Sequence, residues 1–500
     1  MQQTLDFSNV PSSVRQFGIY LDGEMKPSQS GKFTVRYSPA HDCPVTEIAC
    51  AGIDDVDLAV ASARKSFDNK VWSGKSGAER AGVLLKAAAL IRERQSEIAY
   101  WETLETGKPI SQTNGEVSGC ADMFEYASGL SRTINGESYN NLGEQLFGVV
   151  TREPVGVVGL ITPWNFPFLI LCERVPYILA AGCTIVAKPS EYTSATTLIL
   201  AEILTSAGLP NGVMNVVTGT GPVVGQALCE NRNVDMISFT GSTAVGKNVI
   251  CASGETNFKK LGLELGGKNP QIVFSDANLH DAADGVAFGM CFNTGQCCVS
   301  GSRLLVERDV MGKFTELLKE KLGKVIVGDP LNPSTHMGAI TTDAQNSTIL
   351  SYIEKGEAEG AVMSFGCGEI KTKNGQFVGP VVFENVHPSM SIFRDEIFGP
   401  VISVTPFDTV EEAIMLANDT DYGLAAGIWS DDEEFANKIA AKIDAGTVYI
   451  NHYRSVSACA PVGGVKKSGY GRELGPNAIR DFMQEKAIWL GEAAMPDPFG

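Results

Sequence analysis

The chain has 500 residues, of which 44% are hydrophobic and 20% are charged, and its formal net charge is −18 at pH 7. This length exceeds what one hydrophobic core supports and predicts two large domains, and the composition excludes a disordered chain. The excess of acidic residues disfavours nucleic acid and anionic membrane surfaces as partners, because both attract Lys and Arg.

The cysteines, the histidines and the apolar segments exclude further classes of protein. The twelve cysteines lack the spacing of a disulfide framework, so we expect a reducing, cytoplasmic location. The five histidines have no Cys or carboxylate at metal-ligand spacing, and we predict no metal site. Residues 1–15 lack the features of a signal peptide, and apolar runs such as 166–172 are too short to span a membrane.

The first 154 residues predict short strands followed by helices. The turn at Asp22 and Gly23 indicates a hairpin. Apolar residues recur at helical spacing over 54–67, 77–106 and 114–130, with Asp54 as the expected N-cap of the first helix. Two stretches, 133–137 and 145–152, predict the strands of a second hairpin with a long tip.

From residue 155 onward, apolar strands alternate with helices, which is typical of a parallel sheet with crossover helices. The first such unit predicts a doubly wound nucleotide-binding domain. Its expected strands are 155–161, 183–187, 213–217 and 236–239, and its expected helices are 168–181, 194–207 and 222–230. A second α/β unit extends from about 261 to 464, with strands expected at 270–274, 303–306, 401–406 and 446–450. Residues 485–490 predict an isolated terminal strand that needs a partner.

Two stretches in the first unit are candidates for dinucleotide binding, although the usual GxGxxG spacing is absent. Gly241 and Ser242 follow a strand and open a helix, where backbone N–H groups bind phosphate; an ordinary capped helix start is the alternative. Lys188 and Glu191 follow the strand at 183–187, on the edge where ligands of such sheets bind, and they suit ribose hydroxyls. A solvated surface ion pair is the alternative for these two residues.

Cys298 is the candidate nucleophile. It follows Gly295, Gln296 and Cys297, and a Gly-Gln turn gives the backbone freedom to present a sulfur to a cleft. A buried hydrophobic cysteine is the alternative, because free cysteines are usually buried.

Four stretches together resemble the NAD(P)-dependent aldehyde dehydrogenase superfamily, and the resemblance covers nearly the whole chain. They are Pro-Trp-Asn-Phe-Pro at 163–167, Leu-Glu-Leu-Gly-Gly-Lys-Asn-Pro at 263–270, Gly-Gln-Cys-Cys at 295–298 and Glu-Ile-Phe-Gly-Pro at 396–400. The resemblance implies an α/β fold of the aldehyde dehydrogenase type. It consists of a Rossmann-type NAD(P)-binding domain (1–131 and 155–262), a catalytic domain (263–464) and a small β oligomerisation arm (132–154 and 480–500). The arm implies a homodimer or homotetramer formed by strand addition.

The resemblance also implies the reaction. Cys298 adds to an aldehyde, Asn165 stabilises the oxyanion, and Glu264 activates the water that hydrolyses the thioester. Members that pass the acyl group to coenzyme A lack the glutamate equivalent to Glu264, so release of the free acid is favoured. The role of Cys297 stays open. A thiol-dependent esterase or thioesterase, and a non-catalytic protein on the same scaffold, are the alternatives.

We expect NAD as cofactor, with NADP also possible, because the Glu191 carboxylate repels a 2′-phosphate. The residues expected at the cofactor are Ile161, Thr162, Trp164, Lys188, Glu191, Gly241, Ser242, Leu265, Glu396 and Phe398.

The residues expected at a small, polar aldehyde are Phe166, Glu173, Val456 and Val462. A carboxylate at Glu173 favours a hydroxylated or cationic aldehyde, and an ion pair with Arg174 or Arg454 is its alternative role. Small residues at 456 and 462 depart from strict betaine aldehyde dehydrogenases, although the betaine aldehyde, aminoaldehyde and lactaldehyde branches are the most similar ones. His452, Tyr453 and Arg454 in the same loop are candidates for contact with polar substrate groups.

Overall fold

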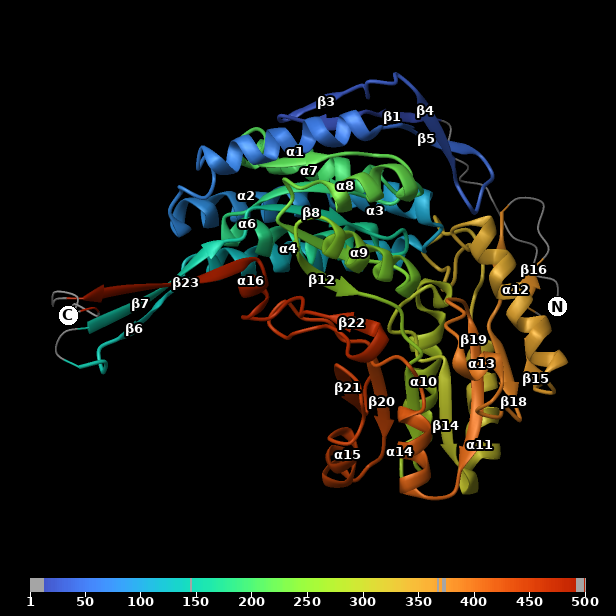
Figure 1. The fold of residues 1–500 in the computed structure, drawn as a ribbon. Coiled ribbons are helices and arrows are strands. Elements are labelled where there is room, and N and C mark those ends of the chain that lie inside the picture. Colours follow the sequence, from blue (N-terminus) through green and yellow to red (C-terminus); the bar gives the residue numbers. More distant parts are fainter. Residues whose placement is uncertain (1–12, 144–145, 367, 371–374, 492–498, 500) are drawn as a thin grey trace.

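A sheet of eight strands forms the centre of the first half of the molecule (Figure 1). The computed structural model describes residues 13–143, 146–366, 368–370, 375–491 and 499. Residues 1–12, Gln145, Cys367 and most of the expected terminal arm segment beyond Gly491 lie outside this range. The order of the strands is β22 (Gly469–Tyr470), β12 (Lys260–Glu264), β11 (Met236–Thr240), β8 (Val157–Ile161), β9 (Thr184–Lys188), β10 (Met214–Val216), β2 (Ile19–Leu21) and β3 (Glu24–Lys26).

The five central strands of this sheet are parallel and doubly wound. The chain proceeds from β8 outward to β9 and β10, then returns to the other side of β8 with β11 and β12. The winding direction therefore reverses between β8 and β11, and such a switch point is where ligands bind, at the carboxyl ends of the strands.

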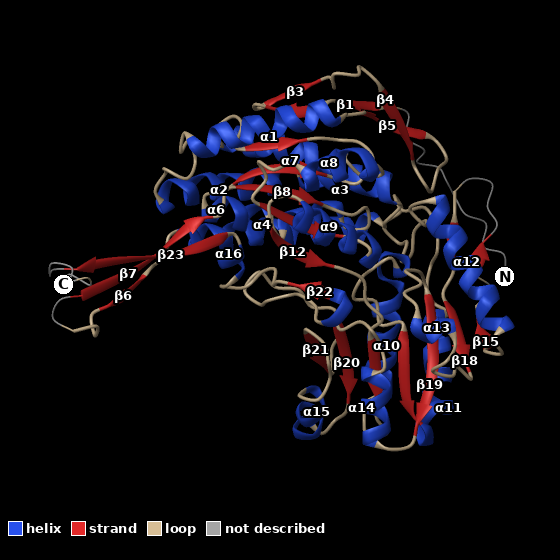
Figure 2. Cartoon of the chain, in the orientation of Figure 1, coloured by secondary structure: helices blue, strands red, loops and turns tan. Residues whose placement is uncertain are grey.

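Helices cover both faces of this sheet (Figure 2). Alternate side chains of β8 enter two different cores, since Val157 and Ile161 belong to one and Val158 and Leu160 to the other. One face packs on α1 (Ile53–Asp68), α8 (Gln226–Glu230) and α9 (Thr243–Glu255). The other face packs on α2 (Gly77–Glu93), α3 (Gln95–Thr106), α4 (Ile110–Ser131), α5 (Pro167–Cys172), α6 (Val175–Ala181) and α7 (Ala195–Ala207).

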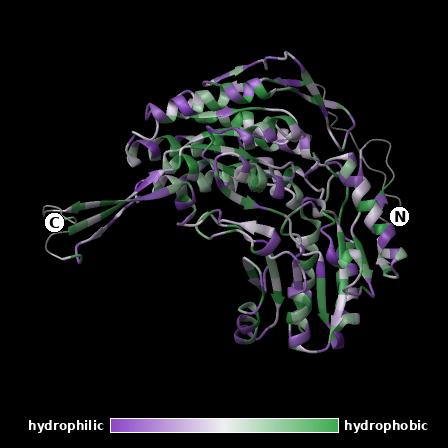
Figure 3. Cartoon of the chain, in the orientation of Figure 1, coloured by the Kyte–Doolittle hydropathy of each residue, from purple (hydrophilic) through white to green (hydrophobic). Residues whose placement is uncertain are grey.

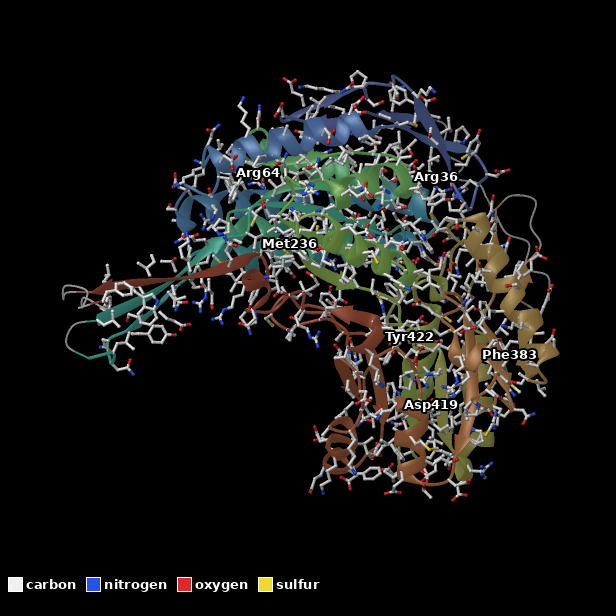
Figure 4. The ribbon with its side chains drawn as sticks, viewed as in Figure 1. Arg36, Arg64, Met236, Phe383, Asp419 and Tyr422 are labelled. Carbon is white, nitrogen blue, oxygen red and sulfur yellow. The ribbon has the colours of Figure 1, made fainter. Side chains whose placement is uncertain are left out.

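A second sheet of seven strands forms the other half. Its order is β15 (Val362–Phe365), β18 (Val381–Glu384), β19 (Val401–Phe407), β14 (Arg303–Glu307), β13 (Pro270–Val273), β20 (Ala425–Trp429) and β21 (Thr447–Ile450), and only β15 is antiparallel to its neighbour. It also lies between two helical layers. They are α10 (Leu279–Cys291) with α11 (Arg308–Leu322), and α12 (Asp343–Ala358) with α13 (Ser391–Arg394), α14 (Val410–Asn418) and α15 (Glu433–Ala440). Met236 of β11 and Phe383 of β18 lie in the separate cores of the two halves (Figure 4).

An arm of three strands projects from the first half. β7 (Leu146–Pro154) pairs with β6 (Glu137–Tyr139) on one side and along its whole length with β23 (Met483–Gly491) on the other. The predicted hairpin and terminal strand therefore belong to one sheet. A second small sheet contains β1 (Arg15–Phe17), β5 (Pro44–Ala49) and β4 (Phe33–Tyr37), and a third contains β16 (Glu369–Ile370) and β17 (Phe377–Val378). The short helix α16 (Ala478–Asp481) precedes β23.

Four predicted helices differ from the structure, and the one expected at 222–230 consists of a π-helical turn (Gly221–Gly225) followed by α8. The helix expected at 168–181 is broken into α5 and α6, because Pro176 has no N–H for the preceding turn. The helix expected at 77–106 is broken at Arg94, whose guanidinium instead pairs with Glu97 and Glu202. The first helix begins at Ile53 rather than after Asp54, and the Asp55 carboxylate accepts the Gly52 N–H at 2.9 Å. Among the described residues, no helix is long and apolar enough to cross a membrane.

Candidate active site

Cys298 lies in a loop that is held in an unusual backbone conformation. Asn293, Thr294 and Gly295 in the preceding 3₁₀ turn all have positive φ angles, of 47°, 55° and 71°. A Cβ at Gly295 would lie 2.4 Å from the carbonyl carbon of Gly399, so only glycine fits this contact. The turn leaves Cys297 buried and Cys298 partly exposed.

Asn269 fixes the position of the Cys298 backbone. Its Nδ2 donates to the carbonyl oxygens of Cys298 and Ser300, each at 2.8 Å, and its Oδ1 accepts the Ala425 N–H at 2.9 Å. Both the Nδ2 and the Oδ1 atom of Asn269 therefore form hydrogen bonds to the backbone, in two other segments of the chain. The sequence gives no sign of this role, because Asn269 appears only as one polar residue in a glycine-rich stretch.

Asn165 lies beside the cysteine loop, as its expected role requires. Its Nδ2 donates to the Gln296 carbonyl at 3.1 Å, and the carbonyl of Asn165 accepts from Asn293 Nδ2 at 2.9 Å. An amide nitrogen has two hydrogens, so one remains for a ligand. The neighbouring Trp164 packs edge-to-face on Phe398, with ring centroids 5.4 Å apart.

Glu264 ends β12 and is buried, with 8% of its surface exposed. Its Oε1 has no hydrogen-bond partner and faces Gly463, where a Cβ would approach it to 2.9 Å. Burial, followed by the negative charge of Glu473, raises the pKa of Glu264 well above that of an ordinary carboxyl group.

Arg174 and Glu473 form a buried ion pair next to Glu264 that sequence patterns do not reveal. Arg174 Nε lies 3.0 Å from Glu473 Oε1, and Arg174 also donates to the Ile170 carbonyl at 3.0 Å. Glu173 lies 3.9 Å from the same guanidinium, so the ion pair considered for Glu173 is present with Arg174. Burial raises the pKa of Glu173 to about 7.

The two adjacent cysteines share their protons. The hydrogen bond from Cys298, together with the positive charge of Arg454, lowers the pKa of the Cys297 thiol to about 6, and the same bond raises the pKa of the Cys298 thiol. Titration belongs to such a pair rather than to either residue alone. Cys298 is the more exposed of the two residues.

The residues expected at the cofactor lie at the switch point of the first sheet. Ile161, Lys188 and Thr240 end the adjacent strands β8, β9 and β11. The Thr162 N–H donates to the Lys188 carbonyl at 3.1 Å, and Lys188 pairs with Glu191 at 3.2 Å. The Gly241 N–H donates to the Glu264 carbonyl at 3.1 Å.

The first turn of α9 completes this edge. Ser242 is the N-cap, and its hydroxyl accepts the Val245 N–H at 3.3 Å. Leu265 packs against Gly246 in this helix, and its N–H donates to the Ser468 carbonyl at 2.9 Å.

Glu396 and Phe398 approach the same region from the second half. Glu396 Oε1 accepts the Gly267 N–H at 2.9 Å, and a Cβ at Gly266 would collide with this carboxylate. Burial raises the pKa of Glu396 to about 7. Phe398 has a φ of +56°, a strained conformation that clusters at functional sites.

These residues fit a dinucleotide. The hydroxyl oxygens of Thr162 and Thr240 are buried without a partner, and α9, whose N-terminal N–H groups suit a phosphate, begins three residues after Thr240. Among the described residues, no group of three or more His, Cys, Asp or Glu side chains is arranged to hold a metal ion.

The four residues expected at the substrate separate into different environments. A cavity of about 540 Å³ lies between α4, α5 and the loop after β21, and Leu169, Phe292, Arg454 and Val456 line it. Phe166 is buried behind the cavity and stacks on Phe292 at 6.1 Å. Val462 does not line it, because it bridges to Glu473 as an antiparallel pair, and Glu173 does not line it because it turns toward Arg174.

Comparison with known proteins identifies the family. The profile of the aldehyde dehydrogenase family matches residues 25–488. The putative aldehyde dehydrogenase DhaS of Bacillus subtilis is 40% identical over 94% of this chain and 95% of its own length. The solved NAD-dependent aldehyde dehydrogenase of Sinorhizobium meliloti is 46% identical with a TM-score of 0.95, over 97% of this chain and 96% of that one. The betaine aldehyde dehydrogenase of Staphylococcus aureus in complex with NAD+ is 34% identical with a TM-score of 0.94, over 97% and 96%.

The chain therefore belongs to the aldehyde dehydrogenase family. The predicted family and the predicted α/β fold are confirmed.

The contacts of Asn269 make a testable prediction. Asn269→Ala leaves the Cys298 carbonyl without its donor and the Ala425 N–H without its acceptor, which costs about 3 kcal/mol of unfolding free energy. It also releases Cys298, and a displacement of this kind lowers kcat about 100-fold. Denaturant unfolding and steady-state NADH formation measure the two effects. Asn437→Ala on the exposed face of α15 is the matched control. An Asn269→Ala protein with the stability and kcat of this control would contradict the role.

Proposed function

We propose that Cys298, Glu264 and Asn165 are the catalytic groups with which this NAD(P)-dependent aldehyde dehydrogenase converts a small polar aldehyde to the carboxylic acid. The proposal rests on the observation that side chains from several segments contact the one loop that contains Cys298. The Asn165 carboxamide binds the Gln296 carbonyl, Asn269 binds the Cys298 carbonyl, and a Cβ at Gly267, three residues after Glu264, would lie 2.4 Å from that same carbonyl.

The thiolate of the cysteine pair starts the reaction. Cys298 Sγ forms a bond to the carbonyl carbon, and the carbonyl electron pair moves to oxygen. The free hydrogen of Asn165 Nδ2 and the Cys298 backbone N–H are the donors that stabilise this oxyanion. NAD(P)+, when bound, supplies the acceptor for the hydride that leaves the same carbon. A thioester on Cys298 is left.

Glu264 serves the second half of the reaction. Its unpartnered Oε1 takes a proton from water as the water oxygen adds to the thioester carbon. The carbon–sulfur bond then breaks, which releases the acid and restores the Cys298 thiolate. Of the buried Arg174–Glu473 ion pair, only Arg174 opposes the effect of burial, because Arg174 lowers the pKa of Glu264 while Glu473 raises it further.

Cys298 and Glu264 have different effects when replaced. Cys298→Ala abolishes aldehyde-dependent NADH formation and preserves NAD binding, whereas Glu264→Gln stalls at the thioester. The Glu264→Gln enzyme therefore gives a burst of about one NADH per site, followed by a steady rate about 100-fold or more below wild type. Because only the ionised carboxylate is a base, wild-type hydrolysis rises with pH through the raised pKa of Glu264, and this dependence disappears in Glu264→Gln.

Rapid-mixing absorbance at 340 nm, roughly the absorption maximum of reduced nicotinamide, measures the burst. Glu354→Gln on an exposed face of α12 is the control. Retained turnover in Cys298→Ala, or a Glu264→Gln enzyme without a burst, would reject the assignment. An esterase without redox activity would form no NADH in any variant.

We propose that residues 1–131 and 155–262 form the NAD(P)-binding domain and that residues 263–464 form the catalytic domain. Lys188 and Glu191 then hold the adenosine ribose, and Ser242 with Gly241 meets the pyrophosphate. Glu396, Phe398 and Leu265 lie at the nicotinamide end, with Trp164, Thr162 and Ile161 between the two ends. NAD is the preferred cofactor, because the Glu191 carboxylate lies where a 2′-phosphate would add negative charge.

The preference for NAD has a direct test. Glu191→Gln removes the repulsion and leaves Lys188 free to pair with a 2′-phosphate, so the ratio of kcat/KM for NADP to that for NAD rises about 10-fold. Cofactor titrations at saturating aldehyde measure this ratio. Glu433→Gln, an exposed residue of α15, is the control, and an unchanged ratio in Glu191→Gln would place the discrimination elsewhere.

We propose that the arm makes the protein a homodimer or homotetramer in the cytoplasm. All residues of β23 after Met483 are exposed, and the arm carries hydrophobic stretches far from either core (Figure 3). Trp489 is 60% exposed and Leu490 is 53% exposed, and the outer edge of β23 has no strand beside it within the described chain. Every cysteine in the described ranges is a free thiol, which supports a reducing compartment.

A substitution in the apolar surface of the arm tests whether the arm forms the subunit interface. Trp489→Glu places a charge in the interface and raises the dissociation constant of the oligomer about 100-fold or more. Sedimentation velocity over a concentration series measures the change. Met415→Glu, which alters a residue 62% exposed on α14, is the control. An assembly unchanged by Trp489→Glu would exclude the arm as the interface.

A further inference from the structure

Arg454 is a cation at the substrate cavity without a carboxylate partner. It lies in the loop after β21, where its φ of +65° is rare for a residue other than glycine. Its guanidinium carbon lies 3.2 Å from the centroid of the Phe292 ring and 5.5 Å from that of Phe166. Its Nε is buried without a hydrogen-bond partner.

The acidic side chains around this cavity are already paired with other cations. Glu116 accepts from Lys108 Nζ at 2.6 Å, and the same nitrogen donates to Glu102 at 2.9 Å. Asp122 pairs with Arg92 at 2.7 Å. Glu173, also nearby, pairs with Arg174. Within the described ranges, therefore, no carboxylate neutralises Arg454 by a direct ion pair.

The aromatic surface of the cavity is also occupied by a cation of the protein. The Phe292 face that lines the cavity is covered by Arg454. A cationic aldehyde needs such an aromatic face for itself, and here it would meet the fixed positive charge of Arg454 instead. The cavity therefore disfavours a quaternary ammonium group.

A carboxylate suits Arg454 for geometric reasons. A carboxylate binds a guanidinium through two parallel hydrogen bonds in the guanidinium plane, and the Nε of Arg454 lies in that plane without a partner. The surrounding Phe292, Phe166 and Leu169 exclude water and strengthen this pairing. The same aromatic cluster contains Cys297, and the positive charge of Arg454 acts on the Cys297 thiol, so the guanidinium lies near the cysteine pair.

We propose that Arg454 binds the carboxylate of an oxo acid, that is, a short aldehyde with a carboxylate at its far end, while the aldehyde carbon reaches Cys298. The inference rests on the proposed function of Cys298 and names the substrate class of that site. The product is then a dicarboxylic acid. The small side chain of Val456 leaves the cavity open next to the guanidinium.

Three aldehydes of similar size test the substrate class: 4-oxobutanoate, pentanal and the cationic betaine aldehyde. Wild type has a kcat/KM for 4-oxobutanoate about 10-fold or more above that for the other two. Arg454→Gln lowers the value for 4-oxobutanoate about 100-fold, mainly through KM, and changes that for pentanal less than about 3-fold. Arg454→Lys retains part of the preference as a point charge. Arg308→Gln, an exposed arginine paired with Asp408, controls for the change in net charge.

The outcomes separate the two proposals. If pentanal is oxidised as efficiently as 4-oxobutanoate, the role of Arg454 is rejected and the dehydrogenase function stands. If Arg454→Gln slows all three aldehydes equally, Arg454 acts on the cysteine pair rather than on the substrate, and the proposal is again overturned. If wild type forms NADH from none of them, the proposed function fails.

Alkylation provides a readout that needs no turnover. The Arg454 guanidinium attracts the anionic reagent iodoacetate over neutral iodoacetamide at the cysteine pair, and peptide mass spectrometry measures both rates relative to exposed Cys251. We expect the ratio of the two rates to fall about 10-fold in Arg454→Gln. A ratio that does not change, even if both rates fall, would overturn the proposal.

Discussion

The contacts of the Asn269 carboxamide determine where the reactive sulfur lies. Asn269 immediately precedes β13, Ser300 lies shortly before β14, and Ala425 begins β20, so one side chain joins the starts of three adjacent parallel strands. The cysteine loop is therefore attached to the amino edge of the second sheet. Asn165 and Glu264, in contrast, follow or end strands of the first sheet at its carboxyl edge. The site forms where these two edges face each other.

Burial of charge is the main energetic cost of this arrangement. Lys108 with Glu102 and Glu116, and Arg174 with Glu473, are almost fully buried, and such pairs rarely stabilise a protein by themselves. Their cost is consistent with a site that needs perturbed pKa values, because burial is also what raises the pKa of Glu264 and Glu396. Arg454 differs from these cations because the described chain offers it no carboxylate, and this difference distinguishes a substrate contact from a structural one.

Local sequence patterns predicted most of the fold and the candidate residues. Alternating apolar strands located the parallel strands to within a few residues, because buried strands need continuous apolar runs. The assignments of Cys298, Glu264 and Asn165 came from the resemblance of short stretches of the sequence to the aldehyde dehydrogenase family. The break between α5 and α6 was missed although Pro176 marks it, and the break at Arg94 has no proline or glycine to signal it. The Arg174–Glu473 pair and the three contacts of Asn269 join segments distant in the sequence, and only tertiary structure brings them together.

Residues 463–473 contact the site, and the chain then continues away from it into the arm. Gly463 contacts the Glu264 carboxylate, and the Ser468 carbonyl accepts the Leu265 N–H. β22 forms the edge of the first sheet. Glu473 neutralises Arg174 before the chain continues into β23. During synthesis on the ribosome, these residues emerge after Glu264, Leu265, β12 and Arg174. Before then, Arg174 has no Glu473 to neutralise it and β12 is an uncovered edge. One continuous segment, residues 463–491, therefore contributes both to the surroundings of Glu264 and to the edge strand of the arm.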